Sequence, residues 1–174
     1  MGGPKQARCS GGDLISQYLE AVSRKDETAV DRFFHPDIEY TVNGVVFPDP
    51  ASGVPSISPD LQQVFPWFGV HRGRAAVKAF LARLHQNLEV MAYGPRTVVS
   101  DGEKAAVCGW FRLRALPTSR TMDVGYAVIA ELKDGLIAKY RFVENTLAVA
   151  DAFRTDGVWH IANDGTVQSL PLSA

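Results

Sequence analysis

Residues 110–145 read WFRLRALPTSRTMDVGYAVIAELKDGLIAKYRFVEN and form the longest continuous β signal in the chain. The residues around and within this stretch predict three strands, at 103–116, 120–133 and 136–144. Pro117-Thr118-Ser119 supplies the first turn, and Asp134-Gly135 supplies a short turn of the hairpin type. We therefore expect a β-meander, one face of which binds whatever the protein binds.

Size and composition indicate one globular domain. The chain has 174 residues, 46% of them hydrophobic and 21% charged, with a net charge of −1. This balance gives no electrostatic footprint for nucleic acid or an anionic membrane, and no apolar run approaches the roughly 20 residues that span a bilayer. The first 12 residues lack an apolar core, so we expect a flexible tail rather than a secretory signal. Cys9 and Cys108 require no disulfide and form no metal-ligand pattern, which favours a reducing, cytoplasmic location.

The rest of the chain predicts helices before strands. Apolar spacing predicts helices that begin at Asp13 and Asp26 and a third over residues 74–89, with strands at 38–42 and 90–100. Residues 43–73 are rich in proline and read as a loop, either a lid over a cavity mouth or a surface loop packed on the core. Residues 146–154 predict either a helical turn or a short helix, and residues 157–167 predict one further short strand. The domain then spans 13–154, and 155–174 is a C-terminal extension.

Helices followed by a run of strands indicate an α+β fold. At this point the chain resembles the nuclear transport factor two superfamily, and within it the SnoaL-like cyclases and limonene-epoxide hydrolases. The resemblance rests on this order of elements, on LRALPTSR at residues 113–120 and on GRAAVKAFL at residues 73–81. It implies a cone-shaped, curved antiparallel sheet wrapped over three N-terminal helices, with a single apolar cavity. It also implies a homodimer, for which the outer sheet face with Trp110, Arg112 and Arg141 is suited.

The catalytic pattern of the epoxide hydrolases is not kept. Their tyrosine falls on Tyr40, which matches, but their asparagine falls on Val42. Their Asp-Arg-Asp trio falls on Phe111, Gly109 and Phe142. The resemblance therefore supports the fold more strongly than it supports epoxide hydrolysis.

The chain resembles ketosteroid isomerase more distantly. The helix tyrosine of that enzyme falls on Tyr18, which matches. Its general base would fall near Val42 or Asn43 and its second acid near Ala127 or Val128, and neither carboxylate is present. A base for proton transfer must therefore come from another position.

Strand alternation predicts which side chains of the meander face a cavity, because successive residues point to opposite faces. If Phe111 and Phe142 face inward, Glu144 is the one carboxylate among their inward neighbours. A register shift of one residue would turn Asn145 inward instead. The predicted inward set is Val107, Gly109, Phe111, Leu113, Met122, Val124, Tyr126, Tyr140, Phe142 and Glu144.

An apolar pocket with one carboxylate and several tyrosines is suited to proton transfer beside a carbonyl group. We predict Glu144 as the base, Tyr40 as a hydroxyl donor and His71 as an acid–base partner, with no cofactor. His85 is expected near the cavity edge. The predicted substrate-binding residues are Tyr18, Trp67, Leu84, Leu88, Phe111, Leu113, Val124, Tyr126, Tyr140 and Phe142.

These residues favour a cofactor-independent isomerase or cyclase that acts on a small apolar carbonyl compound, such as a polyketide, a terpenoid or a steroid-like molecule of secondary metabolism. One alternative is an enzyme that opens epoxides with a rebuilt acid–base set. Another is a dimeric protein that binds small molecules without catalysis.

Overall fold

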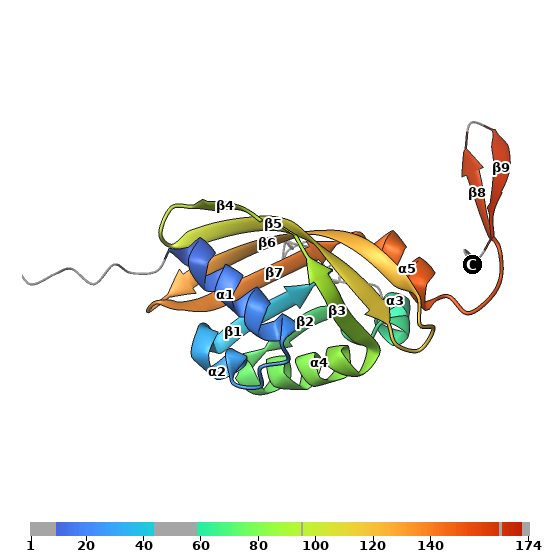
Figure 1. Ribbon diagram of the computed structural model, residues 1–174. Coiled ribbons are helices and arrows are strands. Elements are labelled where there is room, and N and C mark those ends of the chain that lie inside the picture. The colour runs from blue at the N-terminus through green and yellow to red at the C-terminus, as the bar shows by residue number, and fades with distance from the viewer. Residues whose placement is uncertain (1–9, 44–58, 95, 164, 172–174) are drawn as a thin grey trace, which may run out of the picture.

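The computed structural model describes residues 10–43, 59–94, 96–163 and 165–171. A curved sheet of seven strands dominates it, in the order β2-β1-β7-β6-β5-β3, with β4 paired to the other end of β5 (Figure 1). The strands are β1 (Phe34–Val42), β2 (Gly69–Arg72), β3 (Leu88–Tyr93), β4 (Thr97–Ser100), β5 (Lys104–Ala115), β6 (Thr121–Lys133) and β7 (Leu136–Glu144).

The predicted meander is confirmed. Strands β5, β6 and β7 pair antiparallel in sequence order. Lys133 pairs with Leu136, which leaves Asp134 and Gly135 as a two-residue turn. Both turn residues have positive φ, 53° and 76°, as the tight hairpin turn of this length requires.

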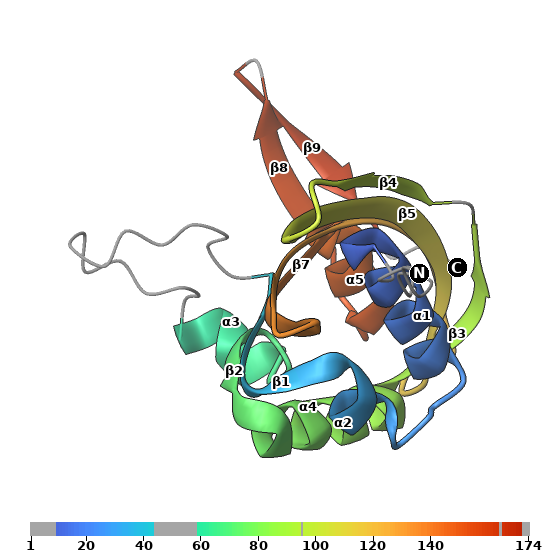
Figure 2. The same ribbon diagram turned by 90° about the vertical axis from the view of Figure 1, so that its left-hand side faces the viewer.

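Helices fill the concave side of the sheet. The helices are α1 (Gly11–Ser23), α2 (Ala29–Phe33), α3 (Pro59–Val64), α4 (Gly73–Asn87) and α5 (Thr146–Phe153). Figure 2 shows α1 lying inside the curve of the sheet, with α2 and α4 beside β1. The first helix begins earlier than predicted, because Ser10 is its N-cap and Asp13 completes a capping box two residues inside the helix.

Strand β1 differs from an all-antiparallel expectation. It pairs antiparallel with β2 but parallel with β7, where Tyr40 lies opposite Tyr140 and Val42 opposite Phe142. The predicted 43–73 loop also contains regular structure, namely α3 and β2. Its residues 44–58 lie outside the described residues, so the prediction of a lid remains a prediction.

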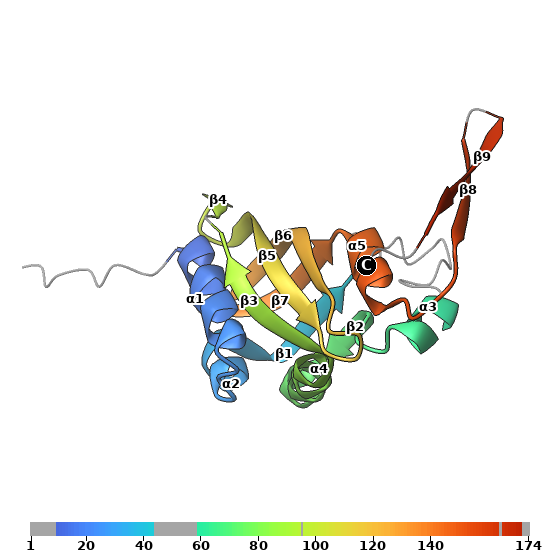
Figure 3. The same cartoon turned by 45° about the vertical axis from the view of Figure 1, so that its right-hand side comes forward.

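Two other predicted elements divide. The strand expected at 90–100 is β3 and β4, which both pair with β5 and meet it at different places. The single strand expected in the C-terminal extension is a hairpin of β8 (Trp159–Asn163) and β9 (Thr166–Leu170). This hairpin stands away from the body of the molecule (Figures 1 and 3).

The core lies between the helices and the concave sheet face. Its largest fully buried side chains include Tyr18, Tyr140, Phe34, Ile15 and Ile38. Burial of such side chains is the main favourable term in folding. Within the described ranges, none of the helices is both long enough and apolar enough to cross a membrane.

Candidate active site

One cavity opens into the core between the helices and the sheet. Its volume is about 80 Å³, and its wall is almost entirely apolar. The wall is made by α1, α4, the inward faces of β1, β3, β5 and β7, and the segment before β2. The lining residues are Tyr18, Leu19, Val22, Ser23, Tyr40, Val42, Trp67, Phe80, Leu81, Leu84, His85, Leu88, Val90, Phe111, Leu113, Phe142 and Glu144.

Glu144, the last residue of β7, is the only carboxylate in this wall within the described part of the chain. Burial disfavours the charged form and raises the pKa of its carboxyl to about 7, while a hydrogen bond from Asn43 opposes the rise. The position of Glu144 in the cavity wall confirms the inward direction that strand alternation predicts for it. Asn145 instead caps α5, where its side chain accepts a hydrogen bond from the Ala148 amide.

Asn43 connects the ends of β1 and β7. Its Nδ2 donates to Glu144 Oε1 at 2.8 Å, and its Oδ1 accepts from the Glu144 amide at 3.0 Å. The ketosteroid isomerase pattern places a general base near this position. The chain has an amide there, and the carboxylate comes from the neighbouring strand.

Three tyrosines cluster beside the cavity. Tyr18 donates its hydroxyl hydrogen bond to the Tyr40 hydroxyl at 3.3 Å, and both residues line the cavity. The Tyr140 ring stacks on Tyr40 with centroids 4.5 Å apart. Burial raises the pKa of all three phenols above the ordinary value, so they remain protonated donors at neutral pH.

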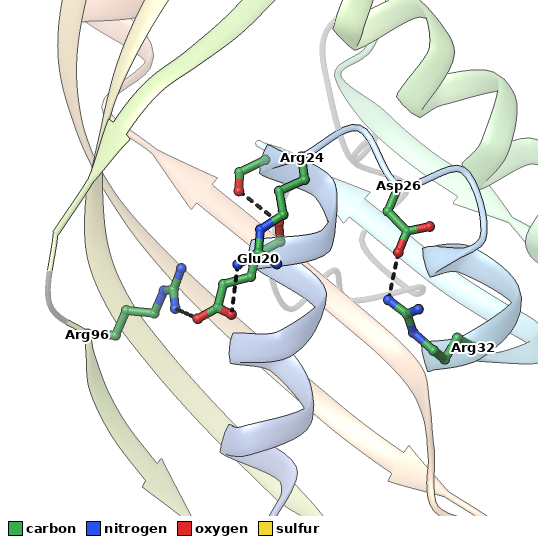
Figure 4. A network of polar contacts seen from close by, with 6 residues as sticks. Glu20, Arg24, Asp26, Arg32 and Arg96 are labelled. Carbon is green, nitrogen blue, oxygen red and sulfur yellow. Dashed lines mark hydrogen bonds and ion pairs between the residues drawn. The ribbon is translucent and has the colours of Figure 1, made fainter.

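A second polar group lies along the same row of the sheet. Tyr126 pairs across strands with Glu144 on one side and with Gly109 on the other. A Cβ at Gly109 would lie 2.7 Å from the Tyr126 hydroxyl, so this glycine gives the ring its space. Arg96 Nε donates to that hydroxyl at 3.2 Å, and Arg96 Nη1 lies 3.4 Å from Glu20 Oε1 on α1 (Figure 4).

The structure divides the predicted substrate-binding residues into two groups. Tyr18, Trp67, Leu84, Leu88, Phe111, Leu113 and Phe142 line the cavity together with Tyr40 and Glu144. Val124, Tyr126 and Tyr140 face inward but are buried behind the wall. Tyr126 is buried because its ring stacks between Phe111 and Phe142, at 4.5 and 5.5 Å.

His71 does not belong to the cavity wall that the described residues form. Its ring packs on Phe80, 4.7 Å between centroids, and its Nε2 donates to the Trp67 carbonyl at 3.1 Å. Burial lowers its pKa, which keeps the ring neutral. This bond and this ring contact hold His71 against Trp67 and Phe80, and its role as an acid–base partner stays a prediction. His85 does line the cavity, and burial lowers its pKa as well.

The outer sheet face carries the residues expected to suit a dimer, with one difference. Trp110 is 40% exposed and packs on Gly94, where a Cβ would lie 1.8 Å from the indole Nε1. Arg112 forms a two-bond ion pair with Asp123, as its outward position predicts. The Arg141 side chain is only 12% exposed, and its Nη1 lies 3.1 Å from Glu131 Oε1.

Asn43 and Arg96 were missed as site residues. The signal for Asn43 was the Asn-Gly pair after a strand, which favours positive φ. Arg96 had no signal, because its reach depends on the position of β4 beside Gly109. In the described part of the chain, no group of three His, Cys, Asp or Glu side chains is arranged to hold a metal ion.

Comparison with known proteins places this geometry in context. A family model described as a SnoaL-like domain matches residues 15–140. An NTF2-like protein from Burkholderia xenovorans superposes with a TM-score of 0.62 at 24% identity, over 81% of this chain and 93% of that chain. Comparison with curated protein sequences gave no match.

Two further solved structures are similar. A proposed isomerase from Rhodopseudomonas palustris has a TM-score of 0.64 at 19% identity, over 80% of this chain and 94% of that chain. A proposed polyketide cyclase from Pseudomonas putida has a TM-score of 0.60 at 16% identity, over 82% of this chain and 97% of that chain. At these identities the likeness concerns the fold alone.

Proposed function

The chain belongs to the SnoaL-like domain family of NTF2-like proteins, and on that premise we propose that it is a cofactor-independent isomerase or cyclase. The substrate class we propose is a small apolar carbonyl compound, such as a polyketide, terpenoid or steroid-like molecule of secondary metabolism. The names of the R. palustris and P. putida proteins support this class of reaction.

One observation carries the proposal: Glu144 and Tyr40 share an apolar cavity. A carboxyl group with a pKa of about 7 is half ionised at neutral pH and can both accept and return a proton. Tyr40 accepts the hydrogen bond of Tyr18, which leaves its own hydrogen for a substrate oxygen. A hydroxyl that accepts one hydrogen bond becomes a stronger donor in the next.

These roles define a balanced reaction. The Glu144 carboxylate removes a proton from the carbon next to the carbonyl, and the C–H electron pair forms an enolate whose oxygen accepts a hydrogen bond from Tyr40. In isomerisation, the protonated Glu144 returns the proton to a different carbon. In cyclisation, the enolate carbon forms a bond to the carbon of a second carbonyl in the same molecule, and the π electron pair of that carbonyl moves to its oxygen. The resulting alkoxide takes the proton from Glu144, which restores the carboxylate. Neither path needs a cofactor.

Hydrogen exchange tests the proposal without knowledge of the natural substrate. In D₂O, the protein should exchange the hydrogens beside the carbonyl of 2-tetralone or isomerise 3-cyclohexen-1-one, as followed by proton NMR. Glu144→Gln should lower this rate about 10²–10⁴-fold, because it removes the base and keeps the shape. Glu131→Gln, on the outer face, is the matched control and should keep the rate. A Glu144→Gln rate close to that of the unmodified protein would reject the assignment.

The two alternatives predict other outcomes. An enzyme that opens epoxides by hydrolysis would add an oxygen atom from ¹⁸O-labelled water to its product as a new hydroxyl group, whereas isomerisation of 3-cyclohexen-1-one adds no oxygen atom. A binding protein without catalysis would retain the probe in the cavity and show no exchange above the rate in buffer.

We also propose a homodimer that forms through the outer sheet face. Trp110 and the ion pair of Arg112 with Asp123 offer an apolar centre and a polar rim on that face. A two-fold contact through one patch is the commonest arrangement among soluble oligomers.

A further inference from the structure

Asn43 occupies a special backbone position. It is the first residue after β1 and has a φ of 49°, in the left-handed region that asparagine tolerates better than most residues. Its amide donates to the Phe142 carbonyl at 2.8 Å, which extends the β1–β7 pairing by one bond. The left-handed conformation takes the side chain out of the strand alternation and places it against the end of β7.

Both polar atoms of the Asn43 side chain contact the same residue. Oδ1 accepts from the Glu144 backbone amide, and Nδ2 donates to Glu144 Oε1. The amide orientation follows from these partners. Turning the amide over would place Oδ1 against a carboxylate oxygen and Nδ2 against an N–H group, so both bonds would be lost.

We propose that Asn43 is the positioning residue of the active site: its amide holds Glu144 Oε1 and leaves Oε2 directed at the substrate proton. This inference rests on the proposed function of Glu144 as the base. Among the described residues no group bonds Oε2, so one carboxylate oxygen is fixed and the other is available. A base held in one rotamer loses less entropy when it reacts.

The surroundings of Glu144 make this donor important. The titratable groups that face it are Tyr40 on β1, Tyr126 on β6, Tyr18 on α1 and His85 on α4, and all of them are neutral at pH 7. Arg96, which contacts this row through Tyr126, bonds to the Tyr126 hydroxyl and pairs with Glu20. The Asn43 amide is therefore the direct donor that favours the ionised base against burial.

A pair of glycine variants separates the amide from the backbone. Asn43→Gly removes both side-chain bonds and keeps the positive φ, which glycine adopts at no steric cost. Ser119→Gly is the matched control, because Ser119 also has a positive φ, 61°, and lies in the turn between β5 and β6. Asn43→Asp replaces the donor with a second carboxylate at the same place.

The readout is the titration of the Glu144 carboxyl itself, followed by NMR in protein labelled with ¹³C at glutamate Cδ. The Glu144 signal is identified by its loss in Glu144→Gln. The pKa of about 7 should rise to about 8 in Asn43→Gly and further in Asn43→Asp, where two carboxylates compete, and should not change in Ser119→Gly. With the exchange probes, Asn43→Gly should lower kcat about tenfold, change KM little and move the acid limb of the pH profile upward.

An unchanged titration in Asn43→Gly would overturn the inference, as would a shift equal to that of Ser119→Gly. If Asn43→Gly does not fold, the titration of Asn43→Asp decides in the same way. The two proposals can fail separately. If Glu144→Gln is fully active and the Glu144 titration shifts in Asn43→Gly, Glu144 is not the base but the positioning contact stands. If Glu144→Gln is inactive and the Glu144 titration does not shift in Asn43→Gly, the positioning role is rejected and Glu144 stands as the base.

Discussion

At the scale of single residues, Glu144 connects the stability of the fold to pH. Its native pKa of about 7 lies above the ordinary value of 4.5, so the folded state retains a proton that the unfolded state releases between these values. The contribution of this proton to the free energy of unfolding is complete below pH 4.5, and it is lost as the pH rises through 7.

This linkage predicts a pH-dependent effect of Glu144→Gln on stability. The variant cannot ionise at position 144, so it avoids the loss of stability that the unmodified protein shows as the pH rises. The free energy of unfolding of the variant minus that of the unmodified protein should therefore increase from pH 5 to pH 8, by up to about 3 kcal/mol. Urea denaturation at both pH values measures the difference. Lys139 and Arg141 lower the pKa of Glu131, so Glu131→Gln should change stability equally at both. Parallel pH curves for Glu144→Gln and the unmodified protein would contradict the linkage.

Alternation along β7 was enough to predict that Glu144 faces inward, because the pairing of this strand with β6 keeps one register from Lys139 to its last residue. The same rule could not find Asn43, whose direction follows from a positive φ. It also placed Tyr126 in the cavity wall, whereas stacking between Phe111 and Phe142 holds that ring behind the wall. Such ring positions depend on neighbours from other strands, which a single sequence does not reveal.

At the scale of elements, the absence of a side chain at Gly109 on β5 leaves space for the Tyr126 ring on β6. Gly109→Ala would place a methyl group 2.7 Å from the Tyr126 hydroxyl and 2.9 Å from Cζ, and the ring is held by stacking and by Arg96. We expect a loss of about 1–3 kcal/mol in the free energy of unfolding, measured by urea denaturation.

Gly125→Ala is the control on the neighbouring strand. A Cβ at Gly125 meets no atom within 4 Å, so its effect should remain within about 0.5 kcal/mol. Equal losses in the free energy of unfolding for Gly109→Ala and Gly125→Ala would contradict this expectation, because they would show that the Tyr126 ring moves away from the new methyl group without destabilising the fold.

The meander and the long helices could be predicted because each has a clear period of its own. Strand β2 and helix α3 are short and lie in a proline-rich stretch, so the spacing of their apolar residues does not show a helical or a strand period. The parallel contact of β1 with β7 joins segments far apart in the chain, so no local pattern indicates it.

At the scale of the whole molecule, the C-terminal hairpin makes few contacts with the rest of the chain that the structure describes. Arg154 donates to the Leu170 and Pro171 carbonyls, and its guanidinium lies 4.6 Å from the centre of the Trp159 ring. The described side chains of β9 are all exposed. A two-stranded hairpin contributes little stability by itself.

Ending the chain after Asp156 should therefore lower the melting temperature by only about 2–4 °C, which corresponds to roughly 1 kcal/mol at this size. Sedimentation of the full and shortened chains should give the same dimer if the outer sheet face forms the contact. A shortened chain that sediments as a monomer would instead assign dimer contact to the hairpin.

The bond between Asn43 and Glu144 also has a kinetic consequence. It joins residues 101 positions apart, across a pairing between an early strand and a late one. Closing so long a loop is entropically costly and slows folding. The two halves of the site therefore meet only when the last strand of the meander docks beside β1. A partly folded chain would have helices and hairpins but no organised base, and regain of activity during refolding would report completion of the fold.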